Sequence, residues 1–168
     1  MSDYFSDLFR ATSHGLVLPR DHEDAINRYV AKRATDRENV ENRPFPRKVD
    51  FWAFCIATAL ALKLEPRDGV PSRWGQKFID TPQGVMADDL CSLLAVVAVA
   101  KLGLDDPGVT ESGRIIELAN RLAAAGCPEV LRKLENGPLN TTPLDQALDF
   151  ARSLQDAARC GNRTGSSP

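Results

Sequence analysis

The chain has 168 residues and a net charge of -2, and it is 43% hydrophobic and 26% charged. These values are ordinary for one globular domain, and the overall charge argues neither for nor against binding of nucleic acid, so any basic surface has to be local. The longest uncharged runs, 51–62 and 90–100, are shorter than the roughly 20 residues of a membrane-spanning helix, so we expect no membrane segment.

The first 18 residues are predicted to form an N-terminal arm. Four apolar side chains in it have the spacing of one face of a short helix: Tyr4, Phe5, Leu8 and Phe9. No apolar stretch of secretory length occurs in the first ten residues, so we expect a cytoplasmic protein whose four cysteines are free thiols.

A helix is predicted to begin near Asp21, because three acidic residues fall in its first turn, where they suit the helix dipole. Ile26 and Val30 lie on its inward face. A basic linker, 36–49, follows. Its two prolines and its lack of periodicity argue against a helix there.

The next helix, 51–64, is predicted to be central. Asp50 precedes it, and its side chain is placed to cap free N–H groups. The helix is apolar on every face except at Thr58 and Lys63, and a helix that is apolar all round is expected to be buried all round. A second apolar helix, 85–104, is expected to pack with it at the centre of the fold.

An irregular loop, 65–84, separates these two apolar helices. It holds three prolines and three glycines, so no long helix crosses it, and a brief strand is expected at Lys77–Ile79. Irregular segments of this length are uncommon inside a compact domain and are often functional. We therefore expect the working surface on this loop and on the basic linker.

Two helices are predicted between the second apolar helix and the last one. The first runs over 110–125 and ends at Gly126. Pro128 then suits the first position of a short helix that continues to Leu134.

The last helix has the clearest start signal, with Thr142 as N-cap, Pro143 at the first position and Asp145 as the third member of a capping box. The predicted fold class is therefore all-α. We expect a single domain, 1–160, built as a bundle of about six helices around the two central apolar ones, and a disordered tail, 161–168.

No set of residues indicates catalysis or a metal site. The two histidines, His14 and His22, are far in sequence from the cysteines, and no close pair of zinc ligands occurs. Cys55 and Cys91 fall in apolar runs and are expected to be buried, whereas Cys127 is expected to be the most exposed thiol. We predict no catalytic residue, no metal and no cofactor.

The candidate binding residues are cations with aromatic residues nearby. Between residues 28 and 48 seven Lys or Arg residues occur with three acids, and Phe45 stands among them. Cations neutralise phosphates and aromatic rings stack on unpaired bases, but Arg and Trp are also common anchors of protein interfaces. The residues singled out for binding nucleic acid or a protein partner are Arg43, Arg47, Lys48, Arg67, Arg73, Trp74 and Lys77.

The run Arg-Pro-Phe-Pro-Arg-Lys-Val-Asp at 43–50 is followed by an Ala-rich helix, by Pro66-Arg67, by the apolar run LLAVVAVA, by Ala-Asn-Arg and by Gly126. This order, over about 43–135, resembles small helical proteins associated with bacterial DNA-phosphorothioation (Dnd-type) defence loci. The chain departs from that pattern after the Ala-rich helix, where Lys63-Leu64-Glu65 stands in place of a glycine. The resemblance implies an accessory role beside a phage-defence or DNA-modification complex, without catalytic residues.

We predict a non-enzymatic accessory or adaptor subunit that acts through contact with another protein, either a second copy or a member of a larger complex. The absent catalytic set and the loop that bears Arg and Trp lead to this prediction. The alternative is a nucleic-acid-binding protein that uses segments 28–48 and 65–84. It requires the cations to share one face, and it predicts a steep salt dependence of binding.

Overall fold

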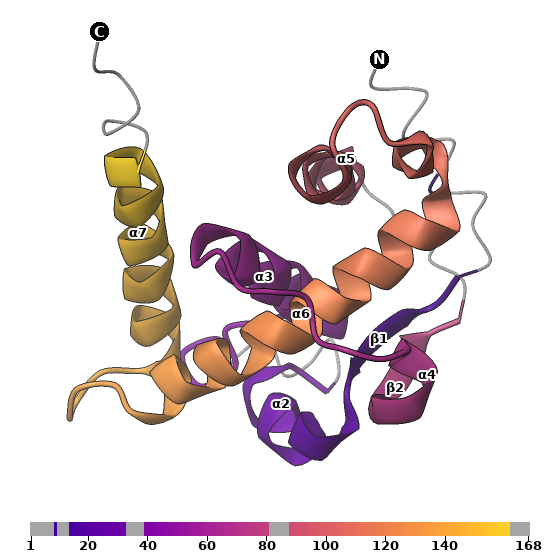
Figure 1. The fold of residues 1–168 in the computed structure, drawn as a ribbon. Coiled ribbons are helices and arrows are strands. Elements are labelled where there is room, and N and C mark those ends of the chain that lie inside the picture. The colour runs from indigo at the N-terminus through magenta and orange to yellow at the C-terminus, as the bar shows by residue number, and fades with distance from the viewer. Residues whose placement is uncertain (1–8, 10–13, 33–38, 81–87, 162–168) are drawn as a thin grey trace, which may run out of the picture.

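The computed structural model describes residues 9, 14–32, 39–80 and 88–161, which are mainly helical with one two-stranded sheet (Figure 1). The mainly helical class is confirmed, and the sheet is an addition to it. None of the described helices is long and apolar enough to cross a membrane. In chain order the elements are β1 (Leu16–Pro19), the 3-10 helix η1 (Arg20–His22), α2 (Glu23–Tyr29), α3 (Lys48–Ala61), α4 (Pro71–Trp74), β2 (Gly75–Ile79), α5 (Asp88–Leu102), the 3-10 helix η4 (Pro107–Thr110), α6 (Ser112–Glu135) and α7 (Pro143–Gly161).

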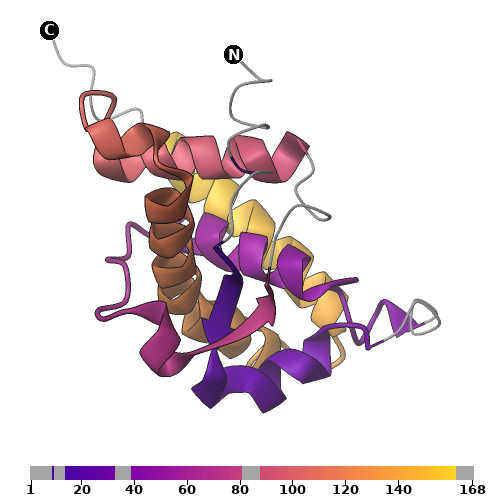
Figure 2. The same ribbon diagram turned by 90° about the vertical axis from the view of Figure 1, so that its right-hand side faces the viewer.

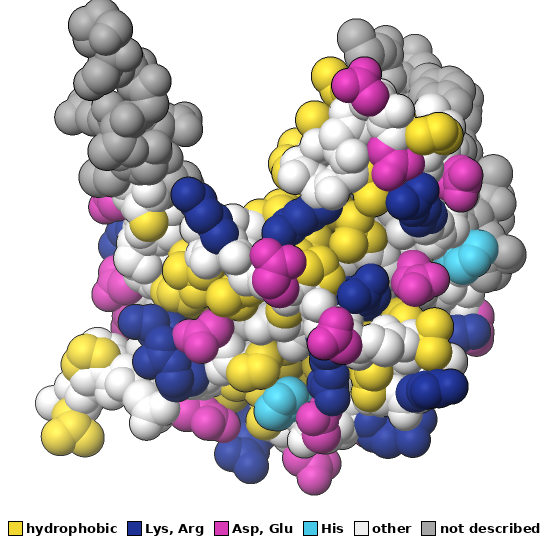
Figure 3. All heavy atoms as spheres, viewed as in Figure 1, with side chains coloured by type: hydrophobic (Ala, Val, Ile, Leu, Met, Phe, Trp, Pro, Cys, Tyr) yellow, Lys and Arg dark blue, Asp and Glu magenta, His cyan; other side chains and the backbone are white. Residues whose placement is uncertain are grey.

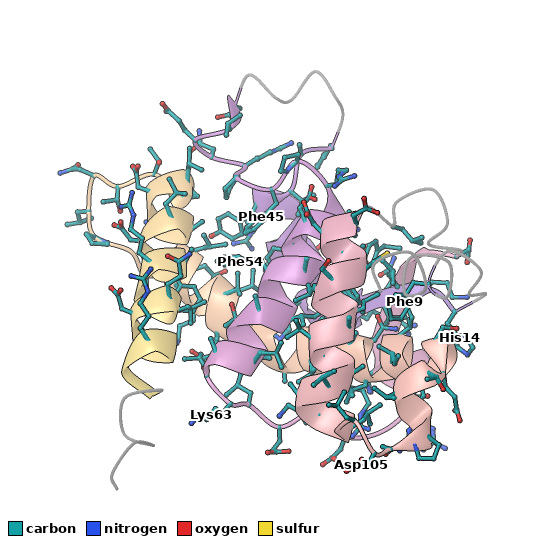
Figure 4. All side chains as sticks on the ribbon, turned by 90° about the horizontal axis from the view of Figure 1, so that it is seen from above. Phe9, His14, Phe45, Phe54, Lys63 and Asp105 are labelled. Carbon is teal, nitrogen blue, oxygen red and sulfur yellow. The ribbon has the colours of Figure 1, made fainter. Side chains whose placement is uncertain are left out.

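The centre of the fold is the pair α3 and α6, which share the most extensive contact between any two elements. Seen from above, α7, α3 and α5 lie side by side and α6 passes beneath them (Figure 4). Trp52 and Ile56 of α3 and Ile115 and Leu122 of α6 have no exposed surface. The prediction that the first apolar helix is central therefore holds for its contact with α6.

α6 is one unbroken helix, so the predicted helix end at Gly126 and new start at Pro128 are wrong. Gly126 lies inside the helix because α3 passes close by, and a side chain there would overlap the carbonyl oxygen of Cys55. Pro128 removes one helical hydrogen bond, at a cost of about 3 kcal/mol. Burial of apolar residues on both sides of it, such as Leu122 and Val130, offsets that cost.

α5 is apolar as expected but not central, so this part of the prediction is wrong. It packs on α6 and η4 and touches α3 along one edge. Leu94 and Val97 are fully buried, whereas Val96 and Val99 on the other side are 56% and 43% exposed. Among the described residues, nothing covers that side of the helix.

β1 and β2 form an antiparallel pair that lies along α6 (Figure 2). The strand predicted near Lys77–Ile79 is confirmed, but residues 16–18, predicted as part of an arm, form a buried strand. Asn120 of α6 joins the sheet to the core, because its Oδ1 accepts from the Val17 backbone N–H (2.9 Å) and from Trp52 Nε1 (3.1 Å). Its Nδ2 donates to the Gly15 carbonyl (3.1 Å).

The linker before α3 is anchored in the core rather than extended in solvent. Phe45 is buried, pairs with Val30 in an isolated parallel bridge, and contacts the rings of Phe51 (5.1 Å between centroids) and Phe54 (5.5 Å). α3 begins at Lys48, so the predicted cap by Asp50 is wrong, and Asp50 lies in the first turn of the helix.

The start of α7 agrees with its predicted capping box. The Asp145 carboxylate accepts from the Thr142 backbone N–H (3.1 Å), and the Asp145 N–H donates to Thr142 Oγ1 (3.2 Å). The first helix is shorter than predicted, since α2 ends at Tyr29. Of the helix predicted at residues 4–9, only Phe9 is described, and it is buried. The predicted tail lies outside the described residues except for Gly161, the last residue of α7.

Candidate functional site

A groove runs between α5 and α7, and hydrophobic side chains gather on its floor, with basic and acidic side chains among them, and on the flank of α5 beside it (Figure 3). α3 lies between these two helices. Trp52 and Cys55 of α3 face α6, so helical spacing places Ala57 on the opposite side of α3 and Ala53 and Leu60 at the edge of that side. Ala57 is exposed, and Ala53 and Leu60 are half-buried against the core. The exposed large apolar side chains of α5 are Val96 and Val99. Two helices that the sequence indicates as apolar all round thus border one open surface.

Four of the predicted binding residues are ion-paired. Arg47 makes two hydrogen bonds to the Asp50 carboxylate (3.0 and 2.7 Å), which raises the pKa of Arg47 above its ordinary value. The other three pairs are longer and join Lys48 to Glu23 (3.7 Å), Arg67 to Asp21 (3.5 Å) and Lys77 to Asp80 (3.5 Å). Two of these acids belong to η1 and α2, so an acidic segment lies among the cations.

The remaining predicted residues differ in their surroundings. The guanidinium of Arg67 lies over the ring of Trp74, 4.8 Å from its centroid, which brings two of the seven residues together. Arg43 is half-buried, and Arg73 is exposed without a side-chain partner in the described part of the chain. Phe45, the aromatic expected among the cations, is buried and has no face free for a base.

The loop after α3 forms one wall of a cavity of about 550 Å³. Arg121 of α6 holds this loop, because its Nε donates to the Arg67 carbonyl (2.7 Å) and its own carbonyl accepts from the Arg67 N–H (3.1 Å). Val70, Ser72 and Lys77 then line the cavity, together with residues of β1 and α6. Of the seven predicted residues only Lys77 borders it. The sequence indicated the loop but gave no signal of the pocket.

Cys55, Cys91 and Cys127, the cysteines whose side chains the structure describes, are buried. This confirms the expectation for Cys55 and Cys91, but Cys127, expected to be the most exposed, is wholly inside the contact between α3 and α6. Burial raises the pKa of the Cys55 thiol well above its ordinary value, and a hydrogen bond with Cys127 raises it further. A buried thiol that stays protonated is a poor nucleophile.

No cluster of three or more His, Cys, Asp or Glu side chains that suits a metal ion occurs in residues 14–32, 39–80 and 88–161 or at residue 9. Comparison with protein families, with curated proteins and with solved structures finds no match to the chain. Function therefore has to be argued from the surfaces described above.

Proposed function

We propose that the protein is a non-enzymatic adaptor that binds an amphipathic helix of another protein in the groove between α5 and α7. The observation that carries the proposal is α5 itself. A helix that is apolar all round normally lies inside a core, yet Val96 and Val99 of this helix are exposed. Contiguous apolar surface on a soluble domain marks an interaction site more often than chance.

The shape of the groove favours a helix as its occupant. Its two walls are helices and its floor is the solvent side of α3, so a third helix is the element that fills the space between them by side-chain interdigitation. Ala53 and Ala57 on the floor are small, which leaves room for the large apolar side chains of a partner helix. A partner stripe of Leu, Ile or Phe at helical spacing fits this surface.

Nucleic-acid binding is supported less well by the same geometry. Four of the six predicted cations already have carboxylate partners, and each pair has to be opened before the cation can neutralise a phosphate. Arg73 is the exposed cation without such a partner in the described residues. A single free cation supplies little of the affinity that nucleic acid binding draws from counterion release.

The resemblance of residues 43–135 to Dnd-associated proteins suggests where the partner helix belongs. If the resemblance reflects common descent, the partner is a component of a DNA-modification or phage-defence complex. The identity of the complex and the docking in the groove are separate parts of the proposal, because a partner from any other complex can still bind in the groove.

The test compares affinity capture from an extract of the source cells by three forms of the chain: unmodified, Val96→Asp and Leu139→Asp. Leu139 is 95% exposed and lies in the turn before α7, so its substitution is a matched control outside the groove. We expect one protein to be recovered by the unmodified chain and by Leu139→Asp, and its recovery to fall about tenfold or more with Val96→Asp, because a carboxylate is then buried without a partner.

Equal recovery with Val96→Asp and Leu139→Asp contradicts docking in the groove, and so does the absence of any recovered protein. Light scattering on the purified forms identifies a second copy as the partner if the unmodified chain is dimeric and Val96→Asp is monomeric. Recovery of nucleic acid that is lost at high salt and with Arg73→Glu, but kept with Val96→Asp, supports the alternative function instead.

A further inference from the structure

A second site lies away from the groove, in the cavity where β1, β2 and α4 meet α6. Its volume, about 550 Å³, is within the range of small-molecule sites. Apolar side chains from three elements form its inner surface: Val17 of β1, Pro71 of α4 and Ile116 of α6. Val17 is on the side of β1 that does not join the main core, so its burial belongs to this cavity.

The cations of the cavity come from the strand side. Arg20 follows β1 directly, and its Nη2 donates to the Gly75 carbonyl (3.2 Å). This bond fixes the guanidinium at the cavity and leaves its other N–H groups free for a carboxylate, which it is shaped to bind with two parallel hydrogen bonds. Lys77 adds a second cation, held only by a 3.5 Å contact to the exposed carboxylate of Asp80.

A carboxylate faces the cavity from the helix side. Glu117 of α6 is exposed and makes no ion pair or hydrogen bond with any described residue. Asn120, one turn further along α6, also borders the cavity, but its amide already bonds Val17, Trp52 and Gly15. The cavity therefore offers a ligand cations on one wall and a carboxylate on the other, with an apolar surface between them, and His14, Ser72 and Gln76 also line it.

We infer that this cavity binds a free α-amino acid with an aliphatic side chain. Its carboxylate pairs with Arg20 and Lys77, its ammonium pairs with Glu117, and its side chain packs on Val17 and Ile116. A purely anionic ligand such as phosphate meets repulsion from Glu117. A purely apolar ligand makes no use of Arg20, Lys77 and Glu117, which are exposed and stay solvated beside it. The zwitterion satisfies both walls and the apolar surface together.

Calorimetry with four related probes tests the assignment: L-leucine, N-acetyl-leucine, leucinamide and the tripeptide Gly-Gly-Leu. N-acetyl-leucine lacks the ammonium and leucinamide lacks the carboxylate, so each removes one of the two charge contacts. We expect L-leucine to bind and each of the two modified forms to bind about tenfold or more weakly, as loss of a charged hydrogen bond predicts. The tripeptide moves the ammonium away from Glu117 and is expected to bind as weakly as N-acetyl-leucine.

Two variants assign the contacts to residues, and a third is the control. Arg20→Gln is expected to weaken L-leucine about tenfold but not to weaken leucinamide, which has no carboxylate and is repelled by the Arg20 charge. Glu117→Gln is expected to weaken L-leucine but to strengthen N-acetyl-leucine, because it removes the repulsion between Glu117 and the ligand carboxylate. Glu129→Gln, on the same helix but outside the cavity, is expected to bind all probes like the unmodified chain. These ligand-by-variant patterns separate a lost contact from a misfolded protein.

Three results overturn the inference. The first is a dissociation constant for L-leucine above roughly 10 mM. The second is equal binding of L-leucine and its two modified forms, and the third is a tripeptide that binds as tightly as L-leucine, which assigns the site to a peptide C-terminus. The groove is tested separately, because Val96→Asp is expected to leave leucine binding unchanged and Arg20→Gln to leave partner capture unchanged.

Discussion

Cys55 and Cys127 face each other between α3 and α6, and neither has exposed surface. Burial is the main cause that raises the pKa of the Cys55 thiol, since a thiolate there has no water to solvate it. The two sulfur atoms thus act as small apolar groups in the core. The sequence does not reveal that Cys127 is buried, because Cys127 stands between a glycine and a proline, which together suggest a helix boundary.

The raised pKa of Cys55 predicts a loss of stability at alkaline pH. Above pH 9.0, the ordinary thiol value, the unfolded chain releases the proton that the folded chain keeps, so the unfolded state is favoured as the pH rises. We expect the contribution of this thiol to lower the free energy of unfolding by at most about 1.4 kcal/mol per pH unit. Urea unfolding from pH 8 to 10.5 measures it, and Cys55→Ala is the control. Identical slopes for the two proteins contradict the assignment.

Gly126 allows the closest approach of the two central helices. Gly126→Ala favours a helix by about 1 kcal/mol, but the new methyl group overlaps the Cys55 carbonyl oxygen and the backbone of α3. We expect overpacking to dominate and the free energy of unfolding to fall by about 1–3 kcal/mol. Urea titration measures the change. Gly113→Ala, where the nearest atoms to the new methyl group belong to the His14 side chain and not to backbone, is the control and is expected to cost less.

At the scale of elements, the sequence predicts correctly the features that depend on local residue preferences. It fails for the features that depend on contact with another element. The capping box of Thr142 and the strand near Lys77–Ile79 follow from local residue preferences. The break expected at Gly126 fails because that glycine serves a tertiary contact. A pattern of apolar residues shows that a helix has surface to bury, but not which element covers it, so the sequence does not reveal that α5 is open on one side.

The candidate surfaces are predictable to a similar degree. The loop 65–84 stands out in the sequence, and part of it, including Lys77, borders the cavity. The pairing of the basic residues with Asp21 and Glu23 has no sequence signal, because these acids lie more than 20 residues away along the chain. The two helices predicted at 51–64 and 85–104 carry more apolar residues than the described chain buries. This excess was the sequence signal of the groove.

Two neighbouring valines of α5 test how that helix is covered. Val97→Ala removes two buried methyl groups, and we expect it to lower the free energy of unfolding by about 1.5–3 kcal/mol. Val96→Ala makes the same chemical change on the exposed side and is expected to stay within about 0.5 kcal/mol of the unmodified chain. The pair cancels the difference in helix preference between Val and Ala. Equal losses in thermal or urea unfolding contradict a free groove.

At the scale of the molecule, the groove and the cavity lie on different sides of the central pair of helices, α3 and α6. α3 and α6 bury each other, α7 and α5 flank α3 above, and the sheet lies along α6 (Figures 2 and 4). The groove therefore has a firm floor, α3, and one wall, α5, that is packed on a single side. A docking surface built this way fixes the position of a partner through the floor and adapts to it through the wall.

This arrangement predicts an order of local stability that native-state hydrogen exchange can measure. Amides in the middle of α3 and α6 are expected to exchange only through global unfolding, because both helices are buried in each other. Amides of α5, which has neighbours on one side, are expected to exchange through a smaller opening that leaves the central pair intact. Addition of the captured partner slows exchange in α5 toward the rate of α3, while leucine slows exchange at Gly75–Lys77 instead. If α5 exchanges as slowly as α6 in the free protein, then α5 is as stable as the core, and the inference that α5 is an adaptable wall of the groove is wrong.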